Sequence, residues 1–150
     1  MPFAASRAFG PSVPLSGRLR SELGGARRAL RATAQRSGSA MIIFAVGEVD
    51  ASNELAWKHL LSEVTARASA PGTIIVDVRE LSFIGCCGFA ALAAELQRCR
   101  RRGISLRLVS QQPIVARIAA ACGLRRLLPI HPTIESALSQ ASAAANGGRT

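Results

Sequence analysis

Four consecutive residues, Gly85-Cys86-Cys87-Gly88, are the densest group of reactive side chains in this 150-residue sequence. They follow a run of β-branched and apolar residues that begins at Ile74, and they precede an alanine- and leucine-rich pattern that reaches Leu96. The pattern indicates a buried strand that passes directly into a helix. Because the first amides of a helix are unpaired and its dipole is positive there, an anion or a thiolate would be stabilised at this junction.

The two junction cysteines raise the question of whether this protein is a thiol enzyme. Covalent catalysis by a cysteine needs a general base, and the two histidines, His59 and His131, lie far from the junction in sequence. A phosphatase-type loop also needs an arginine six positions after the nucleophile, where Leu92 and Ala93 stand. We therefore expect no enzymatic activity and no small-molecule substrate. A thiol enzyme that uses one of the two junction cysteines is kept as the weaker alternative.

The cysteines also bear on metals and on the cellular compartment. Cys86, Cys87, Cys99 and Cys122 show no C-x-x-C spacing, so we expect neither a metal site nor a cofactor. Residues 1–28 contain no apolar stretch of roughly 7 to 15 residues of the kind that an export signal requires. Cysteines without such a signal point to a reducing, cytoplasmic location.

Composition favours one soluble domain. The chain is 49% hydrophobic and 19% charged, and no apolar run approaches the roughly 20 residues of a membrane span, so no membrane association is expected. The net charge is +10, but its excess lies mainly in the first 40 residues, which hold seven arginines against Glu22 alone. A bulk charge locates no binding site, and direct nucleic-acid binding is not expected.

The elements that position the junction are predicted from hydrophobic periodicity and capping residues. Residues 1–29 are interpreted as a disordered or weakly helical basic arm, residues 30–141 as the folded domain and residues 142–150 as a flexible tail. Within the arm, the segment from Ser16 to Arg28 is the one expected to be weakly helical. The domain is predicted to begin with a β-hairpin of strands 30–36 and 41–50. Further strands are predicted at 73–81, 104–110 and 127–130, and helices at 54–68, 86–102, 113–121 and 133–143.

This order predicts an α/β fold with a mostly parallel central sheet, opened by a β-hairpin and packed with about four helices. Ser52 or Asn53 is the expected N-cap of the first of these helices, although Asp50 is a further candidate cap. Leu55, Leu60, Leu61 and Val64 recur at roughly helical spacing in the same segment.

From about Leu30 to Ser139 the chain resembles the STAS domain, the fold of bacterial anti-sigma factor antagonists. Three features in order carry the resemblance, and together they span about 110 residues. They are Gly47-Glu48-Val49-Asp50, the strand-to-helix junction from Val76-Asp77-Val78 through Phe83-Ile84-Gly85-Cys86-Cys87-Gly88, and Cys122-Gly123-Leu124 with Leu127-Leu128-Pro129-Ile130. The paired cysteines and the Arg-Cys-Arg-Arg-Arg-Gly segment look similar to an actinobacterial subgroup that acts on the anti-sigma factor of a stress-response sigma factor.

In the family the junction reads Asp-Ser-Ser-Gly, and the serine before the glycine is phosphorylated by the anti-sigma factor, which is a serine kinase. Here the family aspartate corresponds to Gly85 and the phosphorylated serine to Cys87. A thiol is not a substrate for such a kinase. The resemblance therefore implies an antagonist that lacks the usual switch, in which phosphate adds nearly two negative charges beside the binding surface.

A thiol switch is the substitute that the residues suggest. Cys86 lies where helix amides would raise the thiolate fraction, and Cys122 is one candidate disulfide partner, with Cys87 and Cys99 as others. Closure between the vicinal pair would strain the backbone. Cys86 lies at the start of one crossover helix and Cys122 at the end of the next, and these two points are expected at opposite ends of a parallel sheet. A disulfide needs Cα atoms within about 7 Å, so this topology argues against the pairing. The alternative is that all four cysteines are structural.

The resemblance implies a protein that binds an anti-sigma factor of the serine-kinase type and releases its sigma factor. The implied partner-binding residues are Asp50, Ser52, Gly85, Cys86, Cys87 and Gly88. An interaction module of a stressosome or a lipid-trafficking assembly is the alternative within the same fold.

Overall fold

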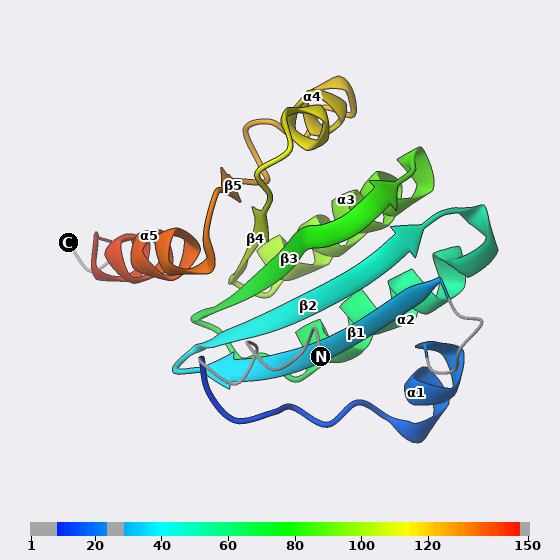
Figure 1. The fold of residues 1–150 in the computed structure, drawn as a ribbon. Helices are drawn as coiled ribbons and strands as arrows, with labels where there is room; N and C mark the ends of the chain where they lie inside the picture. The colour runs from blue at the N-terminus through cyan, green and yellow to red at the C-terminus, as the bar shows by residue number, and fades with distance from the viewer. Residues whose placement is uncertain (1–8, 24–28, 148–150) are drawn as a thin grey trace.

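The computed structural model describes residues 9–23 and 29–147, and these residues build a five-stranded sheet in the order β1-β2-β3-β4-β5 (Figure 1). The first two strands are antiparallel and the remaining pairs are parallel. The elements are α1 (Gly17–Leu23), β1 (Leu30–Ser37), β2 (Ala40–Val49), α2 (Glu54–Ala66), β3 (Gly72–Ile84), α3 (Cys86–Arg101), β4 (Ile104–Val109), α4 (Pro113–Ala121), β5 (Ile130–His131) and α5 (Ile134–Gly147). The expected α/β fold, with a mostly parallel sheet opened by a hairpin, is confirmed.

The hairpin and the parallel strands have local causes in the sequence. Ser37 pairs with Ala40, so Gly38 and Ser39 form a two-residue turn, and Gly38 takes the positive φ of +60° that such a turn favours. Each later strand is reached through a helix, which is the connection that a parallel neighbour requires.

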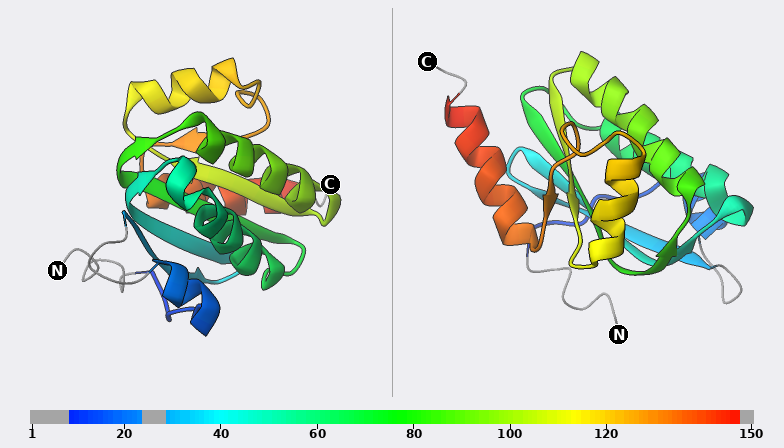
Figure 2. Two further views of the ribbon diagram at one scale, coloured as in Figure 1. Left: turned by 90° about the vertical axis from the view of Figure 1, so that its right-hand side faces the viewer. Right: turned by 90° about the horizontal axis from the view of Figure 1, so that it is seen from above.

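Helices cover the two faces of the sheet unequally. Figure 2 shows α2 and α3 on one face and α5 on the other. The larger core lies under α2 and α3 and includes Trp57, Phe89 and Leu92. A smaller cluster joins Ile134 and Ala137 of α5 to strand residues of the opposite face. The predicted inward stripe of the helix at 86–102 is confirmed, since Phe89, Leu92, Leu96 and Cys99 are all buried.

The N-terminal segment differs from the expected arm in the part that the structure describes. Residues 9–23 lie along the outer edge of β1, where the Val13 amide donates to the Ala34 carbonyl at 2.8 Å, and they end in α1. Four apolar side chains of this segment are buried in the larger core: Val13, Leu15, Leu19 and Leu23. Burial of these side chains repays the entropy of ordering the segment. The predicted helix between Ser16 and Arg28 is observed over Gly17–Leu23, and residues 24–28 lie outside the described part.

Two elements also differ in their boundaries from the sequence-based predictions. The strand expected at 127–130 is observed at Ile130–His131, because the amides of Leu127 and Leu128 donate to the Leu124 carbonyl and continue the turn after α4. The last helix reaches Gly147, beyond the predicted end at residue 143. Its predicted cap is confirmed, since the Thr133 hydroxyl accepts from the Ser136 amide at 3.0 Å.

Candidate functional site

The candidate site lies where the parallel strands β2 and β3 end side by side. Glu48 pairs with Phe83 and Val49 pairs with Ile84, so the segments that follow the two strands must be neighbours. The Gly85 amide donates to the Val49 carbonyl at 2.9 Å and joins these segments directly. Predicted site residues that are over 30 positions apart in sequence are thus brought to one end of the sheet.

Asp50 organises the first of the two segments. It caps a short 3-10 turn, Ala51–Asn53, and its carboxylate accepts from both the amide and the hydroxyl of Ser52. Asn53 completes a reciprocal capping box by accepting from the Asp50 amide at 2.9 Å. The hydrogen bonds from Ser52 hold the pKa of Asp50 below its usual range, so this carboxylate is ionised at neutral pH.

The caps differ in detail from the prediction for this helix. Asn53 immediately precedes α2 as expected, but its side chain makes no capping bond to that helix. Instead, the Asn53 amide group donates to the Glu48 carbonyl at 2.9 Å. The capping role of Asp50 is therefore observed, and its side chain fixes the position of Ser52 on the surface.

The second segment begins α3 with two glycines that serve different purposes. Gly85 is the N-cap and has an extended backbone, with φ −81° and ψ 176°, but no side chain to cap the helix. Gly88 is buried, and a Cβ there would lie 2.6 Å from Ile84 Cγ1. Its carbonyl accepts from the Trp57 indole at 3.1 Å. Gly88 therefore acts through close packing of α3 on the sheet and on α2, beneath the surface rather than on it.

The four cysteines occupy different environments and all have free thiols. Cys86 and Cys122 are exposed, Cys87 is partly buried and Cys99 is buried. Burial, followed by the charge of Glu95, raises the pKa of Cys99 to about 11, so this thiol stays protonated at neutral pH. Cys99 is a core side chain, and reactivity is confined to the more accessible cysteines.

Two large apolar side chains at the sheet end were not predicted as site residues. Leu55 is 65% exposed and Phe83 is 52% exposed. Leu60, Leu61 and Val64 are buried but Leu55 is not, because Trp57 fills the inward position of the first turn of α2. On a helix, residues two apart project about 200° from each other, so the presence of Trp57 was the available signal.

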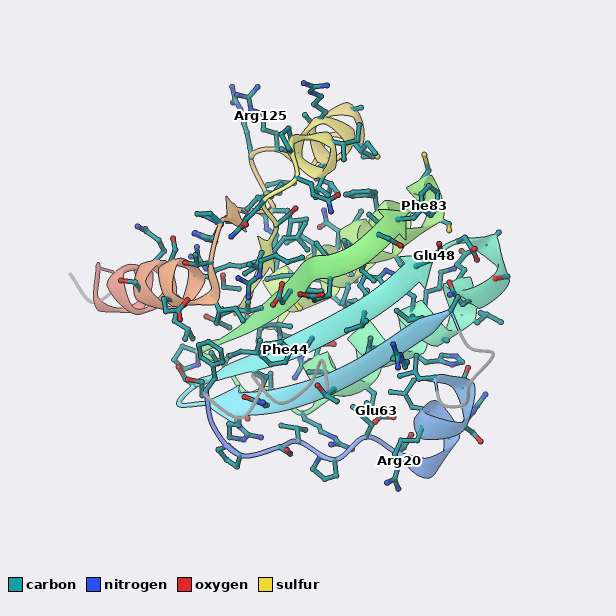
Figure 3. All side chains as sticks on the ribbon, viewed as in Figure 1. Arg20, Phe44, Glu48, Glu63, Phe83 and Arg125 are labelled. Carbon is teal, nitrogen blue, oxygen red and sulfur yellow. The ribbon has the colours of Figure 1, made fainter. Side chains whose placement is uncertain are left out.

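Charge at this end is opposite in sign to the net charge of the chain. Glu48 is exposed next to Phe83, as Figure 3 shows, and Asp50 follows two residues later. Glu54 is nearby in sequence but is paired with Lys58 at 2.9 Å. A hollow of about 360 Å³ beside these residues is lined in part by Ser52 and Leu55. We define the sheet-end surface as Glu48, Asp50, Ser52, Leu55, Phe83, Gly85, Cys86 and Cys87.

The histidines are engaged elsewhere. His59 Nδ1 lies 2.9 Å from the Glu22 carboxylate, and His131 lies 3.0 Å from an Arg107 nitrogen. Neither is hydrogen-bonded to a cysteine. Within residues 9–23 and 29–147, no three His, Cys, Asp or Glu side chains gather as metal ligands, and no helix there is both long and apolar enough to cross a membrane.

Comparison with known proteins identifies the family of this chain. The STAS domain model of protein families matches residues 31–137. The chain is 58% identical over 130 residues to the candidate anti-anti-sigma factor Rv2638 of Mycobacterium tuberculosis, covering 87% of this chain and 88% of that protein. It is 52% identical over 111 residues to the anti-sigma-F factor antagonist RsfA of the same species, covering 74% of this chain and 87% of that protein.

Solved structures share the fold. An anti-sigma factor antagonist from Mycobacterium paratuberculosis superposes with a TM-score of 0.69 at 21% identity, covering 79% of this chain and 99% of that one. The unphosphorylated form of the antagonist SpoIIAA gives a TM-score of 0.59 at 18% identity, covering 75% and 96%. On the match across residues 31–137 and the identity to the curated relatives, this chain belongs to the STAS domain family.

Proposed function

We propose that this protein is an anti-sigma factor antagonist that binds an anti-sigma factor of the serine-kinase type through the sheet-end surface and so releases a sigma factor. The observation that carries the proposal is the convergence of Asp50, Ser52 and Cys86 with two exposed apolar side chains at one end of a STAS fold. The names of the two Mycobacterium tuberculosis relatives support the same function.

The sheet-end surface has the composition of a protein-binding site. Phe83 and Leu55 offer apolar anchors, and fixed polar groups surround them, which is the arrangement that concentrates binding energy. Asp50 and Ser52 are held by their own hydrogen bonds, so little side-chain entropy is lost when a partner binds. The matching surface of the partner would carry a cation for Asp50 or Glu48 and an apolar recess for Phe83.

Control by serine phosphorylation would be absent at the usual position. Cys87 stands there, partly buried in the first turn of α3, and a thiol does not accept phosphate from a serine kinase. The protein would be competent for its partner without a phosphatase to activate it.

Redox control through Cys86 and Cys122 is the finer part of the proposal. These are the two exposed thiols, and Cys86 belongs to the sheet-end surface. Oxidation of Cys86 would place a polar or bulky group within the contact area. A disulfide with Cys122 would additionally require the end of α4 to approach the start of α3.

The decisive experiment measures binding to the purified kinase-type anti-sigma factors of the same organism by isothermal titration calorimetry in reducing buffer. We expect one of them to bind, and Phe83→Ala and Leu55→Ala to weaken that binding by about tenfold each. Arg101→Ala, at an exposed residue at the C-terminal end of α3, is the control and should leave the binding unchanged. Failure of every anti-sigma factor to bind would contradict the proposal.

The redox part is tested separately on the same complex. Protein oxidised by peroxide should bind less well than reduced protein, and Cys86→Ser should remove the difference. Cys122→Ser distinguishes a disulfide, which it would abolish, from oxidation of Cys86 alone. Equal affinity of oxidised and reduced wild-type protein would exclude redox control and leave the antagonist function standing.

A further inference from the structure

A second exposed apolar pair lies away from the sheet-end surface. Ile114 in the first turn of α4 is 51% exposed, and Leu127 in the turn after α4 is 38% exposed. Within the described residues, the large apolar side chains with the greatest exposure are these two together with Leu55 and Phe83. Ile114 and Leu127 thus flank α4, one in its first turn and the other in the turn that follows it.

A hollow of about 350 Å³ lies between α4 and the segment that follows it. It is lined by Ala116, Arg117, Ala120, Arg125, Leu128 and Ile130. Small alanines of α4 make one wall, and Leu128 and Ile130 supply an apolar floor. The hollow is of the size that receives an apolar side chain rather than a whole helix.

The charge of this second surface is positive and unbalanced. Arg117 and Arg125 line the hollow, and neither forms an ion pair within the part of the chain that the structure describes. Arg126 is exposed next to them. We define the α4 surface as Ile114, Arg117, Arg125, Arg126 and Leu127 together with the hollow.

The two surfaces are complementary to each other. The sheet-end surface presents the aromatic ring of Phe83 beside the Glu48 carboxylate, with Asp50 ionised nearby. The α4 surface presents an apolar hollow edged by two arginines. Figure 3 shows Glu48 and Phe83 next to each other and Arg125 at a separate part of the molecule. The two surfaces of one chain therefore cannot contact each other, but the sheet-end surface of one copy can contact the α4 surface of another.

We propose that the protein associates with itself head to tail, with the sheet-end surface of one copy bound to the α4 surface of the next. The Phe83 ring enters the hollow, and Arg117 and Arg125 pair with Glu48 and Asp50. Because the two surfaces differ, each contact leaves one surface free at each end, which generates a ring or an open chain rather than a closed two-fold dimer.

The association is weak and reversible. Each copy carries a net charge of +10, so copies repel one another, although at physiological salt this repulsion is largely screened beyond about 8 Å. The contact does not depend on the proposed function, but both use the sheet-end surface. An anti-sigma factor bound there would displace the neighbouring copy, so self-association would compete with partner binding and keep part of the antagonist in an inactive form.

Sedimentation velocity of the full chain over a concentration series, in reducing buffer, tests this contact. We expect species larger than the monomer to grow with concentration. The double variant Arg117→Glu/Arg125→Glu should weaken the association by at least about tenfold. Arg100→Glu/Arg101→Glu, at two exposed arginines near the end of α3, makes the same charge change and is the matched control. Both variants lower the net charge and the general repulsion, so weakening in the first alone identifies a specific contact.

A mixing experiment distinguishes head-to-tail contact from any symmetric one. Glu48→Lys/Phe83→Ser blocks the sheet-end surface, and Arg117→Glu/Arg125→Glu blocks the α4 surface. Each variant alone should be monomeric, and an equal mixture should form dimers and nothing larger, because one intact surface of each kind remains. A monomeric wild type at every concentration, equal weakening by the control pair, or a mixture without dimers would overturn the proposal. Binding of the anti-sigma factor is measured separately and is unaffected by those outcomes.

Discussion

Glu48 and Phe83 are register partners on the neighbouring strands β2 and β3, so a carboxylate and an aromatic ring stand side by side at the end of the sheet. This pairing follows two register shifts in β2 and β3, between Phe44 and Val46 and between Gly47 and Glu48. Register shifts of this kind turn a strand and re-aim its side chains. Because β3 carries an extra residue there, Leu81 and Ile84 both face the core although they are three positions apart, and Phe83 between them is exposed.

Asp50→Ala should weaken binding of the anti-sigma factor more than Glu48→Ala does. Asp50 holds Ser52 and the turn before α2, whereas Glu48 is exposed and its side chain makes no hydrogen bond within the described residues. Loss of the cap should also lower the free energy of unfolding. Calorimetric titration with the partner, alongside urea unfolding of each variant, measures both effects. The reverse order of affinities would contradict the contact assigned to Asp50.

Substitution of the two junction glycines should change the free energy of unfolding in opposite directions. A Cβ at Gly88 would meet Ile84 Cγ1 at 2.6 Å and Val49 Cγ1 at 3.1 Å, so Gly88→Ala should destabilise the fold by about 1–3 kcal/mol. At Gly85 the nearest atom would be Phe83 Cε2 at 3.4 Å and the backbone is already extended. Gly85→Asp should therefore cap α3 and stabilise the protein by roughly a few tenths of a kcal/mol. Urea unfolding of the two variants tests the contrast, and equal effects would refute it.

Cys87→Ser should create an acceptor for the kinase activity of the anti-sigma factor. The side chain occupies the first turn of α3, where helix amides favour an added phosphate. Intact mass spectrometry after incubation with the anti-sigma factor and ATP should show one added phosphate on the variant and none on the wild type. Cys86→Ser is the neighbouring control and should stay unmodified. Phosphorylation of the wild type would show that the switch operates at another residue.

Stability should fall at mildly acidic pH through His131. Burial, and then the charge of Arg107, hold its pKa below the ordinary value of about 6.5. Arg107 donates to Nε2, so the neutral ring is the form that the fold requires, and Nδ1 faces the Ser136 hydroxyl at 3.4 Å.

The sign of this effect follows from proton binding. Between about pH 6.5 and the lower folded-state pKa, the unfolded chain binds a proton that the folded chain does not, so the free energy of unfolding falls as pH falls through that window. Above about pH 6.5 both states are neutral and His131 contributes no slope. His131→Gln should flatten the curve, because glutamine can accept from Arg107 without titrating. Identical pH profiles for variant and wild type in urea unfolding would disprove the role of His131.

Local patterns in the sequence were sufficient for most of the architecture. The glycine of the hairpin turn, the helix from Cys86 with its stripe of Phe89, Leu92 and Leu96, and the Thr133 cap are all set by residues within a few positions of one another. The N-terminal segment was the main exception. Its order depends on burial of Leu19 and Leu23 in the core, which is a long-range contact that no local period reveals.

The sequence by itself determined which residues stand at the strand-to-helix junction, because residue type and order are facts of the sequence, whereas the match of Cys87 to the acceptor serine is a prediction from the family resemblance. Only the tertiary structure decided what surrounds them. Parallel pairing of β2 with β3 brings Asp50 next to Cys86, and the inward position of Trp57 turns Leu55 toward solvent. Packing also places Gly88 beneath the surface that its neighbours form. Strand register and packing bring together residues that are distant in the chain, and their spacing in the sequence does not show which of them become neighbours.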